Sequence, residues 1–327
     1  MTEEAIQAID LESSRAARSF RLRGAAAPLA RWIGFKTKIA FVDFWSDFSP
    51  YHGFLKHLLD LSLGGWKPCE SEDEADVVFS SVFPHRPVAY PEKTIAFIWE
   101  NIRPNFKYYR YALSSDIDHY CGRNFRLPVW YGEIAWSPKY RKGPPTFDNA
   151  HGNEALLTIP QLLTARHGPY MRRPKFCALV SSHYEPHRMM VADALASLGP
   201  VDQFGRASGR TDPRSKYEIL QPYVFSLCFE NSMFPGYYTE KLVQAWAAET
   251  IPLYFSDRLV KNEFNTAAFL NRYDFPTLSA FVSEVKDVLA SPERQETIWR
   301  QPLMLQAPTL APAVEFLRTA VRAIQTS

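Results

Sequence analysis

The sequence predicts an α/β protein built from two halves, each with a parallel β-sheet covered by helices. Short apolar runs alternate with segments whose apolar residues recur at helical spacing, and this alternation begins after Lys38 and starts again near residue 175. The 327 residues are 46% hydrophobic, which is enough chain for about two domains. Residues 133–172 are rich in Pro, Gly, Lys and Arg and are expected to connect the halves. Because strands joined by helices form parallel sheets, two such halves would face each other across a cleft.

The first half is expected to hold three long strands and one long helix. The strands are expected at 39–45, 75–83 and 93–101, and the helix at 51–63. Two shorter strands are expected within 116–132, and a helical piece is expected at 153–165 in the connection.

The second half repeats the alternation. Strands are expected at 175–182, 200–205, 224–230 and 251–257, and helices at 185–199, 216–223, 239–249, 279–290 and 312–325. We therefore divide the chain into an N-terminal domain over 1–165 and a C-terminal domain over 172–327. The last helix is expected to pack back on the N-terminal domain.

Residues 1–36 form an extension that differs from the rest of the chain. An acidic start is followed by arginines set among Ala, Phe and Leu. This pattern is typical of a solvated or loosely packed helical tail, and a helix over 12–36 lying on a membrane surface is the alternative. The first residues lack the basic start and apolar core of a secretion signal, and no apolar run reaches the ~20 residues needed to span a bilayer. We expect a cytoplasmic protein, with peripheral contact at the inner face of the cytoplasmic membrane as the alternative.

Charge and cysteine content exclude several function classes. A net charge of +2 gives no reason to expect a nucleic-acid partner. The four cysteines lack metal-ligand or CxxC spacing, and Cys177 and Cys228 lie in apolar runs, which is typical of small buried thiols in a reducing compartment. No GxGxxG follows a strand and no GxxxxGK[ST] is present, so neither dinucleotide nor P-loop binding is indicated.

Polar residues gather where two strands of the second half end, which is where open parallel sheets bind ligands. One loop is SSHYEPHR and the other is FENSMFPGYYTEK. Thr239 is a candidate N-cap, so the free N–H groups of the next turn would carry roughly half a positive charge. With Lys241 and Arg188 this turn could hold a phosphate or diphosphate, Glu240 could accept from ribose hydroxyls, and Tyr237 could stack on the ligand or donate to phosphate. The plainer interpretations are a capped surface helix and a solvated arginine.

The stretch FSLCFENSMFPGYYTEKLVQAWAAETIPLYFSD (225–257) resembles the signature of the α1,3/α1,4-fucosyltransferases, most closely the bacterial members. Further similar segments follow in the family's order: FVDFW near residue 41, FIWENIRPNF (97–106), YALSSDIDHY (111–120), FRLPVWY (125–131), Pro186–Arg188 and FNTAAFLNRYDF (264–275). The resemblance implies a GT-B fold, in which two Rossmann-like domains face a cleft. It also implies inverting transfer of L-fucose from GDP-β-L-fucose to N-acetylglucosamine or glucose in an oligosaccharide or glycolipid acceptor, such as a Lewis-type glycan of lipopolysaccharide or a glycoprotein.

The resemblance assigns roles to individual residues. Arg188 and Lys241 are expected at the pyrophosphate, Tyr237 at the phosphates and Glu240 at the ribose. Glu230 and Asn231 are expected to line the fucose side of the pocket, and Lys216, Thr239 and Ser182 complete the expected donor site. No cofactor is expected, and a divalent metal would at most stimulate the reaction.

Asp116 and Asp118 are similar to the DxD motif of metal-dependent glycosyltransferases. They lie in the expected acceptor domain, so we expect a structural role for them and no metal site.

Glu100 is the candidate general base. It ends the apolar strand TIAFIW, so it should emerge at the carboxyl edge of the sheet and face the cleft, and the family's matching glutamate has that role. An ordinary ion pair is the plainer interpretation. Trp45, Trp99 and Asn101 are expected near the acceptor, since sugar C–H faces pack on aromatic rings, although core packing would explain the tryptophans equally.

Three alternatives stay open from the sequence. The same fold and base could use another GDP-sugar, or could form an α1,4 linkage. The protein could also be a non-catalytic glycan- or nucleotide-binding protein.

Overall fold

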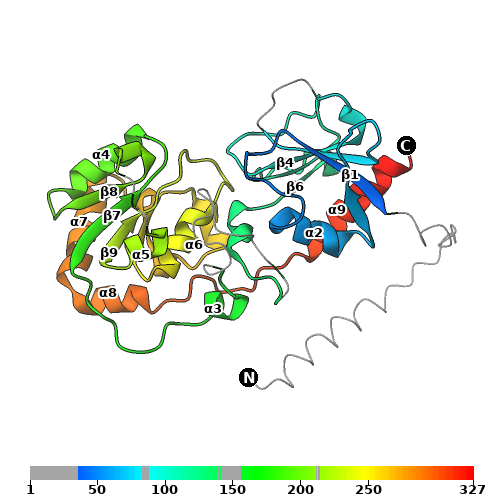
Figure 1. Ribbon diagram of the computed structural model, residues 1–327. Helices are drawn as coiled ribbons and strands as arrows, with labels where there is room; N and C mark the ends of the chain where they lie inside the picture. Colours follow the sequence, from blue (N-terminus) through cyan, green and yellow to red (C-terminus); the bar gives the residue numbers. More distant parts are fainter. Residues whose placement is uncertain (1–35, 83–87, 139, 141–155, 211, 213) are drawn as a thin grey trace, which may run out of the picture. The chain divides into compact units, whose positions relative to one another are not determined.

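The computed structural model describes residues 36–82, 88–138, 140, 156–210, 212 and 214–327 (Figure 1). Residues Lys36–Ser327 form one compact unit. Almost all of the expected membrane-surface helix at 12–36 lies outside the described residues, and so does much of the connection after Ser137. None of the helices in the described segments combines the length and the apolarity that a bilayer span requires.

The first sheet has six parallel strands. In chain order they are β1 (Thr37–Val42), β2 (Trp66–Pro68), β3 (Val77–Ser80), β4 (Thr94–Ile98), β5 (Tyr111–Ser114) and β6 (Asn124–Arg126). They are arranged in the order β2-β1-β3-β4-β5-β6. Strands β3 and β4 are buried along their whole length, as expected for a parallel sheet with covered faces.

The second sheet has five parallel strands. They are β7 (Lys175–Val180), β8 (Val201–Phe204), β9 (Tyr223–Leu227), β10 (Ile251–Tyr254) and β11 (Leu270–Asn271), in the order β11-β10-β9-β7-β8. In register, Cys177 pairs with Phe225 on one side and with Val201 on the other. The two sheets confirm the α/β fold class predicted from the alternating pattern.

Nine further segments complete the part of the fold that bears on function. The helices are α2 (Phe54–Ser62), α3 (Ile159–Leu163), α4 (Pro186–Leu195), α5 (Lys216–Leu220), α6 (Glu240–Ala247), α7 (Leu278–Ala290), α8 (Pro292–Trp299) and α9 (Ala311–Gln325), and the 3₁₀ segment η4 covers Val129–Glu133. Helices α4 and α7 cover one face of the second sheet, because their apolar sides share its core.

The last helix, α9, returns to the first sheet. Its apolar residues recur at helical spacing, and Leu317 and Val321 share a core with Leu58 of α2 and with Ile39 and Phe97 of the sheet. Figure 1 shows α9, in red, lying beside α2, in blue. The two ends of the described chain therefore build one core.

Some local expectations were wrong. Residues 116–122 are a loop and a 3₁₀ turn, not a strand, because the Asp116 and Asp118 carboxylates accept from backbone N–H groups two residues ahead at 3.1 and 2.9 Å. Residues 129–133 form η4 after Pro128. Helix α8, the inner strand β5 and the edge strands β2 and β11 were missed, since each is too short or too polar to show a periodic pattern.

The strand orders place a topological switch point in each sheet. In the first sheet the chain passes from β1 to both sides of that strand, and in the second it passes from β7 to both sides. Ligands of open α/β sheets bind beyond the carboxyl ends of the strands at such points. The switch points lie between β1 and β3 and between β7 and β9, so the loops after these strands, with the loop after the neighbouring β4, are the place to look for a site.

Candidate active site

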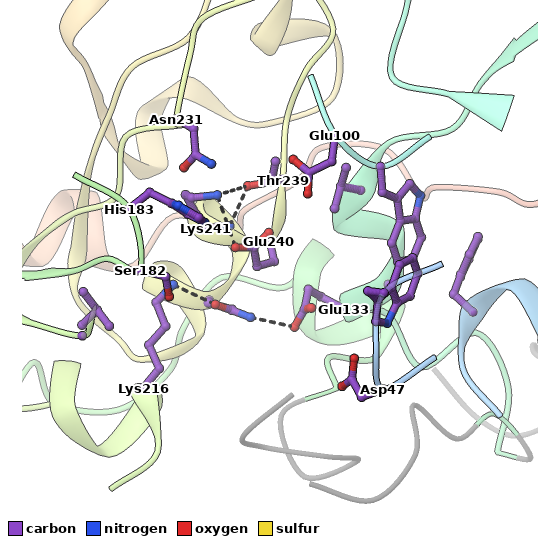
Figure 2. Close-up of a pocket in the computed structure, with 18 of the residues that line it drawn as sticks. Asp47, Glu100, Glu133, Ser182, His183, Lys216, Asn231, Thr239, Glu240 and Lys241 are labelled. Carbon is purple, nitrogen blue, oxygen red and sulfur yellow. Dashed lines mark hydrogen bonds and ion pairs between the residues drawn. The ribbon is translucent and has the colours of Figure 1, made fainter. Parts of the chain in front are cut away.

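A cavity of about 640 Å³ lies at these strand ends. Its volume falls in the range typical of small-molecule sites. Most of the residues singled out in the sequence line it, namely Trp45, Trp99, Glu100, Ser182, Arg188, Lys216, Asn231, Tyr237, Thr239, Glu240 and Lys241. Figure 2 shows Glu100 on the side of the cavity that faces Thr239, Glu240 and Lys241.

The start of α6 forms one wall. Thr239 caps the helix, as predicted, with its hydroxyl oxygen accepting from the Lys241 N–H. The Lys241 ammonium lies 3.0 Å from the Thr239 hydroxyl oxygen, 3.2 Å from a Glu230 carboxylate oxygen and 3.4 Å from a Glu240 oxygen. Burial alone would lower the pKa of Lys241, but the carboxylates of Glu230 and Glu240 raise it. Lys241 is therefore a firmly charged cation at the cavity.

Glu240 is an ionised acceptor at the same wall. Burial would raise its pKa, but the charges of Lys241 and Lys216 outweigh this effect and lower the pKa to about 2. A carboxylate held in this state accepts hydrogen bonds and repels phosphate oxygens, so it suits hydroxyl groups better than a diphosphate.

Glu230, expected on the fucose side of the pocket, is not among the residues that line the cavity. Its side chain is 2% exposed. The carboxylate accepts from the Thr239 N–H and hydroxyl at 2.8 and 2.7 Å and from the Tyr254 hydroxyl at 2.6 Å. Glu230 thus fixes Thr239 and Lys241 from behind the cavity wall.

Arg188 is a buried cation without a carboxylate partner among the described residues. It is 2% exposed, and its guanidinium donates to the Phe229 carbonyl at 2.6 and 3.0 Å, to the Ser181 hydroxyl at 2.9 Å and to the Asn231 amide oxygen at 2.7 Å. These neutral acceptors hold the side chain in place and leave its charge uncompensated within 4.0 Å. A buried unpaired charge is costly, so an anion at this end of the cavity would be strongly favoured.

Lys216 is a third basic residue at the cavity, and a bridge that the sequence did not predict holds it in place. Its ammonium donates to the Gln244 amide oxygen at 2.9 Å, and the Gln244 amide nitrogen donates to the Glu133 carboxylate at 3.3 Å. Glu133 lies on η4, is buried and also lines the cavity. Nothing in the local pattern around Glu133 marked it, because only the packing of η4 against α6 brings it to the site.

Glu100 lies on the opposite side of the cavity. It lies two residues after the end of β4, and its carboxylate makes no hydrogen bond or ion pair within the described part of the chain. Desolvation by the surrounding protein raises the pKa of Glu100, Lys241 opposes this shift, and Glu240 adds to it. An unpaired carboxylate facing a cationic wall fits a base better than a structural ion pair.

The tryptophans expected near the acceptor line the cavity beside Glu100. The Trp45 and Trp99 rings stack with centroids 6.5 Å apart and planes 9° apart, and both also pack against the first core. The Trp99 indole nitrogen is buried without a hydrogen-bond partner among the described residues. Asn101 does not line the cavity, and its amide donates to the Ser232 hydroxyl.

No group of three His, Cys, Asp or Glu side chains within the described segments is arranged to hold a metal ion. The Asp116 carboxylate accepts from the Tyr120 hydroxyl at 2.7 Å and is 4% exposed. His187 lies 3.0 Å from the Glu230 carbonyl and borders a second, smaller cavity.

Gly236 sets the path of the loop before α6. Its φ is +85°, and a Cβ there would lie 2.5 Å from the Ile117 Cγ2 and 2.8 Å from the Arg126 Nε. We expect Gly236→Ala to lower the free energy of unfolding by about 1–3 kcal/mol in urea denaturation. Gly209→Ala is the matched control, because Gly209 has a φ of +66° and open space around its Cβ, so it measures backbone strain alone. Equal losses in the two variants would contradict the close approach at Gly236.

Comparisons with known proteins agree with this architecture. The family model "Glycosyltransferase family 10 (fucosyltransferase) C-term" matches residues 170–311, and "Alpha-(1,3)-fucosyltransferase FucT N-terminal domain" matches residues 39–132. A relative from Helicobacter pylori, "Alpha-(1,3)-fucosyltransferase FucT", is 27% identical over 213 residues, which cover 59% of this chain and 44% of the relative. The chain thus spans less than half the length of that relative.

Solved structures of α1,3-fucosyltransferase show the same fold. One with GDP has a TM-score of 0.67 at 22% identity and covers 91% of this chain and 94% of that one. One with GDP-fucose has a TM-score of 0.66 at 23% identity and covers 94% of each chain. These likenesses establish the GT-B architecture. Because two models of one family match most of the chain in order, the protein belongs to glycosyltransferase family 10, the fucosyltransferases.

Proposed function

We propose that the protein is an inverting α1,3-fucosyltransferase that uses GDP-β-L-fucose and a glycan acceptor of the N-acetyllactosamine type. The observation that carries the proposal is the division of one cavity between an unpaired carboxylate, Glu100, and a cluster of cations, Arg188, Lys216 and Lys241. The related structures with GDP and with GDP-fucose support the choice of donor.

The cationic wall suits a diphosphate. Arg188 has no carboxylate within 4.0 Å among the described residues, and Lys241 lies in the first turn of α6, where the helix dipole favours an anion. These groups would bind the GDP diphosphate and stabilise the charge that builds on it as the sugar leaves. Burial lowers the pKa of Lys216 below its ordinary value, and the nearby Glu240 offsets part of this shift. Glu240 would accept from the ribose hydroxyls and Tyr237 would lie against the phosphates.

Glu100 would act as the base. Its carboxylate takes the proton from the acceptor hydroxyl while the hydroxyl oxygen bonds to C1 of fucose. The bond from C1 to the diphosphate oxygen breaks and its electron pair leaves with GDP. Because attack and departure occur on opposite faces, one step inverts the configuration. The positions of Glu100 and the cationic wall on two sides of the cavity support this order of groups.

The pH dependence of transfer tests this role of Glu100. A base must be ionised, so activity falls as the pH drops through its pKa. Because desolvation holds the pKa of Glu100 above its ordinary value, we expect the acidic limb of kcat/KM to lie above the ~4.3 of a free glutamate. If the acidic limb lies at or below the pKa of a free glutamate, or if Glu100→Gln retains the same limb, then another group causes the fall in activity.

Product analysis tests the function as a whole. GDP-fucose is incubated with lactose, N-acetyllactosamine or its β1,3-linked isomer, and the products are identified by mass spectrometry and linkage analysis. With lactose and N-acetyllactosamine we expect fucose on the 3-hydroxyl of the glucose or N-acetylglucosamine unit. The β1,3-linked isomer should give no product on that unit, because its 3-hydroxyl already carries galactose. A parallel panel of GDP-sugars, with GDP release as readout, tests donor choice. Faster turnover of another GDP-sugar, or an α1,4 product, would overturn the assignment.

A further inference from the structure

Three side chains of the first half reach the loop that precedes α6. We call residues 228–239 the donor loop and residues 99–106 the base loop. The Asn101 amide donates to the Ser232 hydroxyl, the Arg103 guanidinium carbon lies 3.6 Å from the centre of the Phe234 ring, and Arg126 donates to the Gly236 carbonyl at 2.7 Å. Two of these three contacts come from the base loop.

Arg103 is fixed on its own side of these contacts. Its guanidinium donates to the Asn101 amide oxygen and lies 3.7 Å from the Asp116 carboxylate. Asp116 is itself held by the Tyr120 hydroxyl and by the Asp118 N–H. The Asp116-Ile-Asp118 motif therefore anchors Arg103.

The partner of Arg103 is fixed as firmly. The Phe234 carbonyl accepts from the Tyr237 N–H at 3.0 Å, so the ring of Phe234 and the side chain of Tyr237 belong to one turn. Tyr237 lines the cavity, and so does Glu100, three residues before Arg103. The contact between Arg103 and Phe234 thus lies within three residues of the cavity wall on each side.

We propose that Arg103, anchored by Asp116, is a positioning residue: by stacking on Phe234 it sets the distance between Glu100 and the bound donor. The inference rests on the proposed function. A planar guanidinium can stack on a ring and keep an ion pair at its edge, whereas a lysine ammonium cannot do both. Since a displacement of about 1 Å at a reacting centre can cost about a hundredfold in rate, one such contact is enough to matter.

The test measures transfer kinetics and GDP binding in Phe234→Leu and Arg103→Ala, each alone and combined with Glu100→Gln. We expect kcat to fall about tenfold in each single variant, as expected for losing a partly buried cation–π contact. GDP affinity, measured by calorimetry, should change less than about threefold, because Arg188 and Lys241 are untouched. Arg103→Lys should fall between Arg103→Ala and the wild type.

The combination with Glu100→Gln separates positioning from general damage. If Arg103 acts through the base, Glu100→Gln should lower kcat by a clearly smaller factor in the Arg103→Ala or Phe234→Leu background than in the wild type. Arg258→Ala is the matched control, because Arg258 lies over Tyr273 at 5.6 Å with both residues in the second half. It should leave kcat and the cost of Glu100→Gln unchanged.

The outcomes are distinguishable. Provided that the wild type is active, three results would overturn the positioning role and leave the proposed function standing. The costs in kcat of Glu100→Gln and of the second substitution could simply add, kcat could be unchanged in the single variants, or GDP affinity and kcat could fall in parallel. Phe234→Leu keeps the test decisive if Arg103→Ala does not fold, since it leaves the Arg103, Asn101 and Asp116 contacts in place. A wild-type protein that forms no fucosylated product overturns the proposed function and this inference with it.

Discussion

Glu100→Gln is expected to lower kcat for fucosyl transfer by about 10²–10⁴, the usual contribution of a well-placed general base. Glutamine keeps the size and hydrogen-bonding shape of the side chain but cannot take a proton at neutral pH. The Glu100 carboxylate makes no hydrogen bond or ion pair within the described part of the chain, so binding of GDP should stay within about twofold of the wild type. Single-turnover transfer and calorimetry measure the two quantities.

The thermal stability of Glu100→Gln gives a second check. A carboxyl group whose pKa is raised on folding contributes stability that is present at low pH and is lost as the pH rises through its folded pKa. At pH 7 the ionised Glu100 carboxylate therefore destabilises the fold slightly, and the neutral amide of glutamine removes this effect. The melting temperature of the variant should not fall. A lower melting temperature would indicate that the lost activity reflects damage to the fold.

Glu133→Gln is the matched comparison, because Glu133 is another glutamate of the first half that lines the cavity. Its carboxylate accepts from Gln244, which in turn orients Lys216. We therefore expect Glu133→Gln to act mainly on donor affinity, with a much smaller fall in kcat than Glu100→Gln. The reverse pattern would transfer the base role to Glu133.

Arg188→Ala is expected to weaken GDP binding by about 2–3 kcal/mol, or roughly 30- to 150-fold in Kd, the loss of a charged hydrogen bond to the diphosphate. Arg188 is held against neutral acceptors with no carboxylate within 4.0 Å in the described chain, so its charge is free to act on a ligand. Calorimetry with GDP measures the change, and GDP should also raise the melting temperature of the variant less than that of the wild type.

Two further variants sharpen this test. Arg188→Lys keeps a positive charge but loses the planar fork that contacts Phe229 and Asn231, so it should recover only part of the affinity. Arg258→Ala removes an exposed arginine of the same half outside the cavity and should leave the Kd for GDP unchanged. A Kd for Arg188→Ala within about twofold of the wild type would place the diphosphate elsewhere.

The sequence predicted the fold class because buried parallel strands and amphipathic helices leave local patterns. Apolar runs such as TIAFI, which became β4, and helical periods such as that of α9 follow from burial of one strand or one helix face. It also predicted the N-cap Thr239, since a capping residue must directly precede the turn that it caps. Loops whose polar side chains bond to their own backbone, such as 116–122, leave no such periodic pattern and were not predicted.

The sequence by itself determined which chemical groups are available: a glutamate at the end of β4 and a cationic, capped helix start after β9. Only the tertiary structure decided which of them face the cavity. Glu230 lies behind the cavity wall, Glu133 bonds to the Gln244 that holds Lys216, and Asp116 pairs with Arg103. The physical reason is that a side chain's partner is set by the packing of different elements against each other, as between Glu133 of η4 and Gln244 of α6, which are 111 residues apart. No local sequence pattern records such contacts.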